Sequence, residues 1–123
     1  MHGVTRNSAW RQANPARALL SQTRNSASKR KLECTITQVE VEELLSPMTC
    51  ALTGVPLRWD VAIKKDIWAP SLDRIDNAVG YVAGNVRVVC WGVNLMRGSL
   101  TDAELVNLAR LIVARSEHDA ADH

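Results

Sequence analysis

The sequence has no long hydrophobic run, no cysteine spacing typical of a disulfide scaffold and no apolar N-terminal segment typical of a secretion signal. No stretch of its 123 residues approaches the roughly 20 apolar residues of a membrane-spanning helix, so we expect no membrane partner. The N-terminus is polar and has no apolar segment typical of a secretion signal. The three cysteines are an odd number without the spacing of a disulfide scaffold. These absences predict a reducing, cytoplasmic setting.

The net charge of the chain is also small, with a formal value of +2 at pH 7. Its distribution is more informative, since every charged residue before Glu33 is basic. Such a segment predicts a face that binds a polyanion, and the alternative is a solvated basic helix. The basic residues are Arg6, Arg11, Arg17, Arg24, Lys29, Arg30 and Lys31.

Local signals in the first part of the chain predict an arm, two helices and a short strand. Residues 1–12 are expected to form a loose arm. An Asn-Pro pair then starts a basic helix over about 15–30. Residues 32–36 (LECTI) are expected to form a strand, and a Thr-x-x-Glu capping box starts a helix over 38–45.

The second part of the chain predicts a hairpin followed by helices. Residues 58–69 fit either a strand or an irregular packed loop. Short strands are expected over 71–75 and 86–90, the latter from its alternating pattern. A short helix over 91–97 and a second capping box opening a helix to about 115 follow. The expected fold class is therefore α+β, a small single domain with a β-hairpin and a helix at its centre.

Polar residues cluster around this hairpin. Asp73 on the first strand and Asn94 on the following helix both offer hard oxygen ligands. Two protein oxygens, waters and a phosphate oxygen make a plausible Mg²⁺ site, with Mn²⁺ or another divalent cation as a substitute. Hydrolysis of a phosphodiester needs such a cation together with a group that activates water.

The motif Asp-Arg-x-Asp, Gly-Tyr, Asn-Val-Arg and Asn over residues 71–98 resembles the ββα-metal finger of HNH (His-Me finger) endonucleases. The similarity is greatest to a phage and restriction-enzyme subgroup with Asp-Arg in place of Asp-His. The resemblance covers about 48–112, and it implies a division into a basic arm and helix over 1–33 and a nuclease domain over 34–123. It implies catalytic roles for Asp73, Arg74, Tyr81 and Asn94, with Asp73 and Asn94 as the metal ligands.

The sequence departs from the zinc-bearing members of this family at two cysteine knuckles. Cys50 and Cys90 remain, but the second cysteine of each knuckle is absent. The three histidines lie at positions 2, 118 and 123, in terminal segments. Because structural zinc needs four good ligands, we expect no structural zinc and a buried, adjacent Cys50 and Cys90.

The chemistry of the Asp-Arg pair leaves three interpretations open. Arg74 stays protonated, so it is a poor acceptor of a proton from water. Tyr81, the only tyrosine, could be the base, or Arg74 could clamp the phosphate while the metal or solvent handles the proton. The third interpretation is a site that binds DNA without cutting it.

The remaining residues of the motif are assigned to the turn or to DNA. Asp76, Gly80 and Asn85 are expected to shape the hairpin turn, Asn85 through hydrogen bonds to the backbone. Double-stranded DNA is the expected partner, and cutting both strands would call for a homodimer or two successive events. A DNA-binding module without activity and a zinc-ribbon interaction domain are the rival hypotheses. The residues expected to contact phosphates are Arg87, Arg97, Arg24, Lys29, Arg30 and Lys31.

Overall fold

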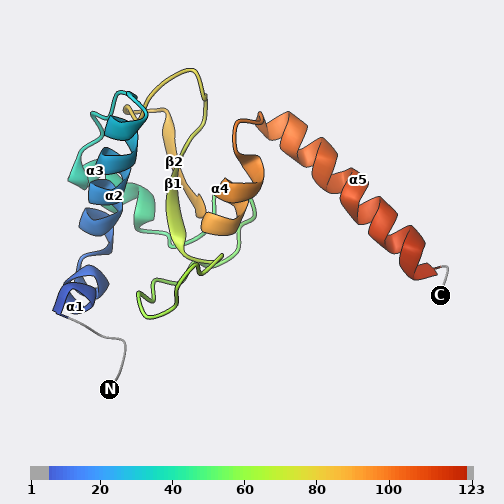
Figure 1. Ribbon diagram of the computed structural model, residues 1–123, viewed down its shortest axis with the longest axis horizontal. Helices are drawn as coiled ribbons and strands as arrows, with labels where there is room; N and C mark the ends of the chain where they lie inside the picture. The colour runs from blue at the N-terminus through green and yellow to red at the C-terminus, as the bar shows by residue number, and fades with distance from the viewer. Residues whose placement is uncertain (1–5, 122–123) are drawn as a thin grey trace.

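A computed structural model describes residues 6–121 as an α+β fold with one two-stranded antiparallel sheet. Helices α2 and α3 lie on one side of the hairpin, α4 lies on the other, and α5 extends away from the rest (Figure 1). The predicted fold class is confirmed. The elements are α1 (Arg6–Ala13), α2 (Pro15–Lys29), α3 (Gln38–Leu45), β1 (Pro70–Arg74), β2 (Val86–Cys90), α4 (Trp91–Arg97) and α5 (Asp102–Ala121).

The hairpin and α4 form one continuous ββα unit. Strands β1 and β2 pair from Pro70 opposite Cys90 to Arg74 opposite Val86. Helix α4 begins directly after β2, with Cys90 as its N-cap residue. It ends at Gly98, whose φ of 51° is a backbone conformation that favours glycine. Because no loop separates β2 from α4, the helix is held close along the hairpin.

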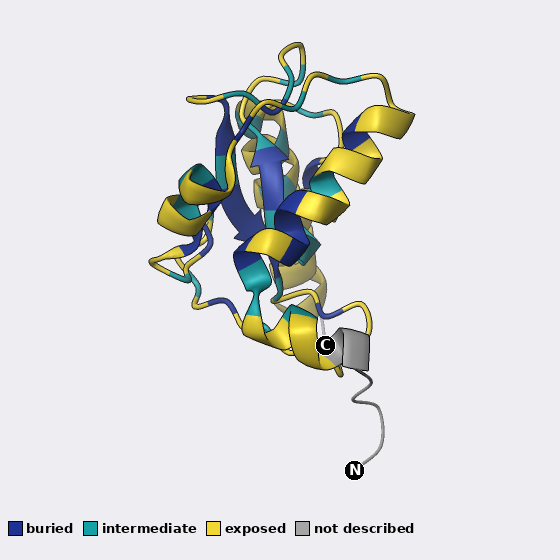
Figure 2. Ribbon diagram, turned by 90° about the vertical axis from the view of Figure 1, so that its left-hand side faces the viewer, coloured by how far each residue is buried: buried dark blue, intermediate teal, exposed yellow. Residues whose placement is uncertain are grey.

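The buried core connects the N-terminal helices to the hairpin. Figure 2 shows the strands largely buried, and the outer surface of the neighbouring helices exposed. Apolar residues on both sides of position 33 belong to the same cluster, so the two predicted segments pack as one body. The most deeply buried members are Leu20, Ala27, Ile36, Val41, Cys50 and Val89.

Two predicted features of the N-terminal part are wrong. Residues 6–12 belong to a helix, not to a loose arm; the rest of that predicted arm lies outside the described residues. The helix is fixed from outside, because Trp59 Nε1 donates to the Arg11 carbonyl and Gln12 Nε2 donates to the Trp59 carbonyl. Residues 32–36 form only an isolated parallel bridge between Cys34 and Tyr81, since no second strand lies there to extend it.

Helix α5 is longer than expected and has no buried residue. Its apolar side chains are largely open to solvent, with Ile112 63% exposed. The predicted capping box is present, because Thr101 N donates to Glu104 Oε1 and Glu104 N donates to Thr101 Oγ1. Of the helices in residues 6–121, none is both long and apolar enough to cross a bilayer.

Candidate functional site

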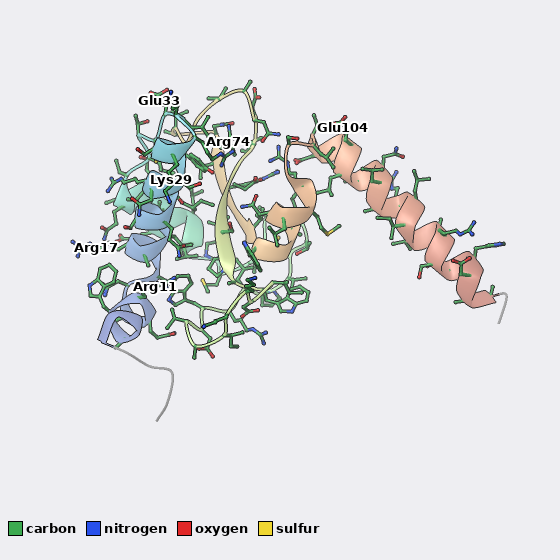
Figure 3. All side chains as sticks on the ribbon, viewed as in Figure 1. Arg11, Arg17, Lys29, Glu33, Arg74 and Glu104 are labelled. Carbon is green, nitrogen blue, oxygen red and sulfur yellow. The ribbon has the colours of Figure 1, made fainter. Side chains whose placement is uncertain are left out.

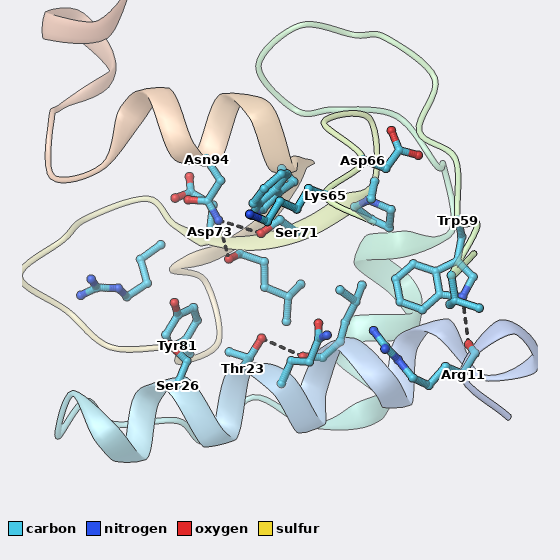
Figure 4. Close-up of a pocket in the computed structure, with 18 of the residues that line it drawn as sticks. Arg11, Thr23, Ser26, Trp59, Lys65, Asp66, Ser71, Asp73, Tyr81 and Asn94 are labelled. Atoms are coloured by element: carbon cyan, nitrogen blue, oxygen red, sulfur yellow. Dashed lines mark hydrogen bonds between the residues drawn. The ribbon is translucent and has the colours of Figure 1, made fainter. Parts of the chain in front are cut away.

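A pocket of about 660 Å³ runs along the free edge of β1, and no residue of β2 lines it. All five residues of β1 contribute to its wall. Helix α2 forms the opposite wall, with Thr23 and Ser26 facing in, and the loop over 58–69 closes one end (Figure 4). The edge of the hairpin is therefore accessible to a ligand, although its faces are covered by helices.

Asp73 and Asn94 line this pocket together and lie next to each other in it (Figure 4). The register of β1 and the direct β2–α4 connection bring them together across 21 positions of sequence. Asn94 Nδ2 donates to Ser71 Oγ at 2.7 Å and to the Leu72 carbonyl at 3.4 Å. These bonds use the amide nitrogen and leave the amide oxygen to act as an acceptor.

The oxygen atoms at this point suit a small divalent cation. Each oxygen of Asp73 accepts one hydrogen bond, which leaves a lone pair on each for a metal. Within residues 6–121 no hydrogen bond is donated to Asn94 Oδ1. No three His, Cys, Asp or Glu side chains gather as metal ligands in the same range. The donor set is thus one carboxylate and one amide, which Mg²⁺ or Mn²⁺ would complete with water.

Asp73 is also held by two arginines. Arg87, directly opposite it on β2, donates from Nε to Oδ2 at 2.9 Å. Arg97, one turn after Asn94 on α4, donates from Nη1 to Oδ1 at 2.9 Å. The side chain of Asp73 is only 5% exposed, so both contacts operate in a mostly water-free environment.

Arg74 and Tyr81 lie farther along the same pocket, toward the hairpin loop. The Arg74 guanidinium carbon is 5.6 Å from the centre of the Tyr81 ring. Arg74 Nη1 donates to the carbonyls of Asn77 and Val79, which fixes the guanidinium beside the loop. Tyr81 is 7% exposed and its side chain points into the pocket (Figure 4).

The loop that joins β1 to β2 is built around Asn85. Its Oδ1 accepts from Asp76 N, and its Nδ2 donates to the carbonyls of Asp76, Val79 and Gly80. Asp76 Oδ1 in turn accepts from Ala78 N, as in an Asx turn. A Cβ at Gly80 would lie 2.4 Å from the Glu33 carbonyl oxygen, so only glycine fits there. Asp76, Gly80 and Asn85 together set the loop that positions Arg74 and Tyr81.

The residues expected to contact DNA fall into two groups. Arg24, Lys29, Arg30 and Lys31 are exposed, and Arg30 lines the pocket. Arg11, Arg17 and Lys29 are spaced along the α1–α2 edge of the molecule (Figure 3). Arg87 and Arg97 lie inside: Arg97 is 2% exposed and donates to Asp73 and to the carbonyls of Arg74 and Ile75.

Sequence reasoning missed several residues of this pocket. Lys64 and Lys65 on the loop at its end, and Ser71 on β1, all line it. The Arg58–Asp66 pair, joined at 2.7 Å and 3.1 Å, braces that loop. Alternation along β1 places Ser71 on the same face as Asp73, which is a signal that could have found Ser71. The lysines carry no such signal, because the loop has no regular period.

Cys50 and Cys90 are buried and in contact with each other. Burial raises the pKa of the Cys90 thiol, and the neighbouring Cys50 sulfur acts in the same direction. Thr53, where the first knuckle would have its second cysteine, hydrogen-bonds to Cys50. The Cys90 sulfur interacts with the backbone of Val93, the corresponding position of the second knuckle.

Comparison with known proteins gives two similarities. No family profile matches the sequence. The chain is 30% identical over 102 residues to an uncharacterized 29.0 kDa protein in the dda-modA intergenic region of Enterobacteria phage T4. The match covers 83% of this chain but only 40% of that protein, so the chain spans less than half its length.

The second similarity is structural. The fold resembles that of PacI, described as a rare-cutting HNH restriction endonuclease that perturbs DNA, with a TM-score of 0.60 at 19% sequence identity. The superposition covers 86% of this chain and 81% of PacI. This likeness shows that the chain has an HNH-like fold.

Proposed function

We propose that this protein is a metal-dependent DNA endonuclease that hydrolyses phosphodiester bonds at the edge of β1. The observation that carries the proposal is that Asp73 and Asn94 line one pocket with Arg74 and Tyr81. The HNH-like fold and the phage relative support the same interpretation. A phage or restriction enzyme acting in the cytoplasm of a bacterial host fits these features.

Asp73 and Asn94 are the residues that would hold Mg²⁺ or Mn²⁺, and Ser71 would fix the Asn94 amide. When bound, a divalent cation neutralises charge on the scissile phosphate and on the leaving oxygen. The chain itself contributes orientation, because the Asn94 amide is held by Ser71 Oγ at 2.7 Å. Arg87 and Arg97 orient the Asp73 carboxylate, because each donates a hydrogen bond to one of its oxygens.

Arg74 is assigned to the phosphate and Tyr81 to the proton. The Nη1 atom of Arg74 is used by two loop carbonyls, which leaves the rest of its guanidinium to donate to phosphate oxygens. Tyr81, beside it in the pocket, is the candidate acceptor of the proton from the attacking water. Tyr81→Phe tests this role, since near-normal turnover would transfer it to solvent or the metal.

Duplex DNA would lie across the mouth of the pocket against basic side chains from two directions. Arg24, Lys29, Arg30 and Lys31 are exposed at the end of α2, and Lys64 and Lys65 are exposed on the loop. Each phosphate contact releases counterions, so binding should weaken steeply with salt. Residues 1–33 would thus serve as the DNA-contacting segment beside a nuclease domain over 34–123.

A plasmid assay tests the proposal. Purified protein should nick supercoiled DNA with Mg²⁺ or Mn²⁺ but not with EDTA. Asp73→Asn and Asn94→Ala should each reduce nicking by at least about 100-fold, because the first removes the negative charge that attracts the cation and the second removes the amide ligand. Asp60→Asn is the matched control, since this exposed carboxylate lines the same pocket and accepts from the nearby Ala62 N–H instead of from an arginine. Equal nicking by the Asp73 and Asp60 variants would overturn the metal site.

A DNA-binding module without activity is the second candidate function. The observation in its favour is that both Asp73 oxygens already accept from arginines. This candidate predicts a salt-sensitive shift of duplex DNA in a gel without nicking in any metal. A single proposed site per chain cuts one strand, so an active enzyme would cut both strands as a homodimer or in two successive events.

A further inference from the structure

Asp73 belongs to a closed ring of four alternating charges. The ring consists of Asp73, Arg87, Asp102 and Arg97. Arg87 joins the two carboxylates, because its Nε donates to Asp73 and its Nη1 and Nη2 each donate to Asp102 at 2.7 Å. Arg97 lies on the other side, 2.9 Å from Asp73 and with its Nε 3.1 Å from Asp102 Oδ1. That last contact is electrostatic only, because the Arg97 Nε–H has no hydrogen-bond acceptor within residues 6–121.

The four members differ in their exposure. The side chains of Arg97, Asp73 and Arg87 are 2%, 5% and 14% exposed, whereas that of Asp102 is 40% exposed. Asp102 is the first residue of α5 and stands apart from the pocket, which it does not line. The hydrogen-bonded guanidinium of Arg87 lowers the pKa of Asp102, so the Asp102 carboxylate is charged at neutral pH.

The charges of the complete ring cancel, with two carboxylates against two guanidiniums. Without Asp102, two arginines would face the single carboxylate of Asp73, and Arg74 stands on the next position of β1. A divalent cation at Asp73 would then enter a region of net positive charge. In a buried setting such a change acts strongly over several ångströms, since little water screens it.

We propose that Asp102 is a positioning residue of the metal site, which keeps Asp73 able to bind a cation by balancing Arg87 and Arg97. The inference rests on the proposed function, because it concerns the same cation. Asp102 engages both terminal nitrogens of Arg87, so only Nε remains directed at Asp73. The first turn of α5 therefore contributes to the site although the rest of the helix leads away from it.

A purely structural role for Asp102 would tie α5 to the hairpin without affecting metal affinity. The readout is therefore Mn²⁺ binding to the purified full chain, by calorimetry or electron paramagnetic resonance, in the absence of DNA. Asp102→Asn should weaken Mn²⁺ binding by about 10- to 100-fold, the range typical when the groups that orient a metal ligand are disturbed, because Arg87 and Arg97 would keep an unbalanced positive charge beside Asp73. Glu104 is an exposed carboxylate in the same helical turn and accepts from the Thr101 N–H, so Glu104→Gln should bind Mn²⁺ like the wild type.

Charge rescue gives the sharpest test. Adding Arg87→Gln to Asp102→Asn restores the balance of the ring, so the double variant should regain most of the lost affinity. An Asp102→Asn protein that binds Mn²⁺ like the wild type, or a double variant as weak as Asp102→Asn, would overturn the inference and leave the metal site standing. Wild-type protein without Mn²⁺ binding, or binding unchanged in Asp73→Asn, would overturn the metal site and this inference with it.

Circular dichroism should establish that each variant is folded. If Asp102→Asn alone does not fold, Arg87→Gln with and without Asp102→Asn makes the same comparison. The loss of the Asp102 charge should weaken Mn²⁺ binding in that background too. Equal affinities of the two proteins would contradict the inference.

Discussion

The two ends of the β1–β2 hairpin are held by different kinds of interaction. At the end where Pro70 pairs with Cys90, buried apolar side chains pack together, among them Cys50 and Cys90. At the end where Arg74 pairs with Val86, they are directional bonds from Asn85 and Arg97 to carboxylate and carbonyl oxygens. Apolar packing tolerates exchange of similar volumes, whereas a buried polar group that loses its partner is costly. The proposed site lies at the end with less tolerance.

The largest effect is expected at Arg97. Arg97→Met keeps much of the side-chain volume but removes the donors to Asp73 and to the carbonyls of Arg74 and Ile75. Breaking a buried ion pair from one side typically costs about 3–5 kcal/mol. Thermal and urea unfolding measure the change. Arg115→Met, in an ion pair with Asp119 that is exposed on both sides, is the control and should shift the transition much less.

Asn85→Ala should have the next largest effect. It leaves the Asp76 N–H and the carbonyls of Asp76, Val79 and Gly80 without the partner that they share. The free energy of unfolding should fall by about 2–3 kcal/mol, since several partly buried backbone groups lose bonds together. Urea denaturation with a native-like circular dichroism spectrum checks it. A loss below that of the cysteine variants described next would contradict the comparison of the two ends.

The cysteine end should tolerate change. Cys50→Ala and Cys90→Ala each remove one small buried side chain, and each should cost about 1 kcal/mol. Because we expect no zinc at this pair, dialysis against EDTA should leave the melting temperature unchanged. Cys34→Ala, at a less buried thiol, serves as the control and should lower the free energy of unfolding by less than either of these two changes. Unfolding on chelation that added Zn²⁺ reverses and added Mg²⁺ does not would show that zinc holds this end.

The smallest effect concerns pH and Asp102. Arg87 lowers the pKa of Asp102 in the folded protein below its unfolded value of about 3.9. The charged Asp102 carboxylate therefore stabilises the folded protein above about pH 4. This stabilisation is lost as the pH falls through the lower pKa that Asp102 has in the folded protein. The side chain is 40% exposed, so screening should keep the contribution below about 1 kcal/mol. The difference in urea stability between wild type and Asp102→Asn should shrink between pH 5 and about pH 2, and a constant difference would contradict this assignment.

Much of the fold could be predicted because its signals are local. The Thr37–Glu40 capping box and the glycine after α4 each act within a few residues, and the structure contains both. Strand β2 forms over 86–90 as predicted, although both of its faces are covered and its burial does not alternate. Helix α1 could not be predicted, because its apolar content is low and bonds to Trp59, 47 or 48 positions away, fix it. The strand over 32–36 failed for a related reason, since Cys34 pairs with a single residue far along the chain.

The candidate site divides in the same way. Asp73 and Asn94 follow from hairpin and helix order, and their placement in one pocket was accessible to sequence reasoning. The ring around Asp73 was not, because the partner of Arg87 depends on the strand register and on where α5 leaves the body. Sequence placed Arg87 and Arg97 toward DNA; the structure places both beside Asp73.

Helix α5 has a consequence for how the protein moves. None of its 20 residues is buried, so α5 lacks the packing against the rest of the protein from which a helix gains most of its stability. Its amide protons beyond the first turn should exchange with deuterium far sooner than those of β2. Slow exchange along α5 would instead reveal that another surface covers its apolar side in solution.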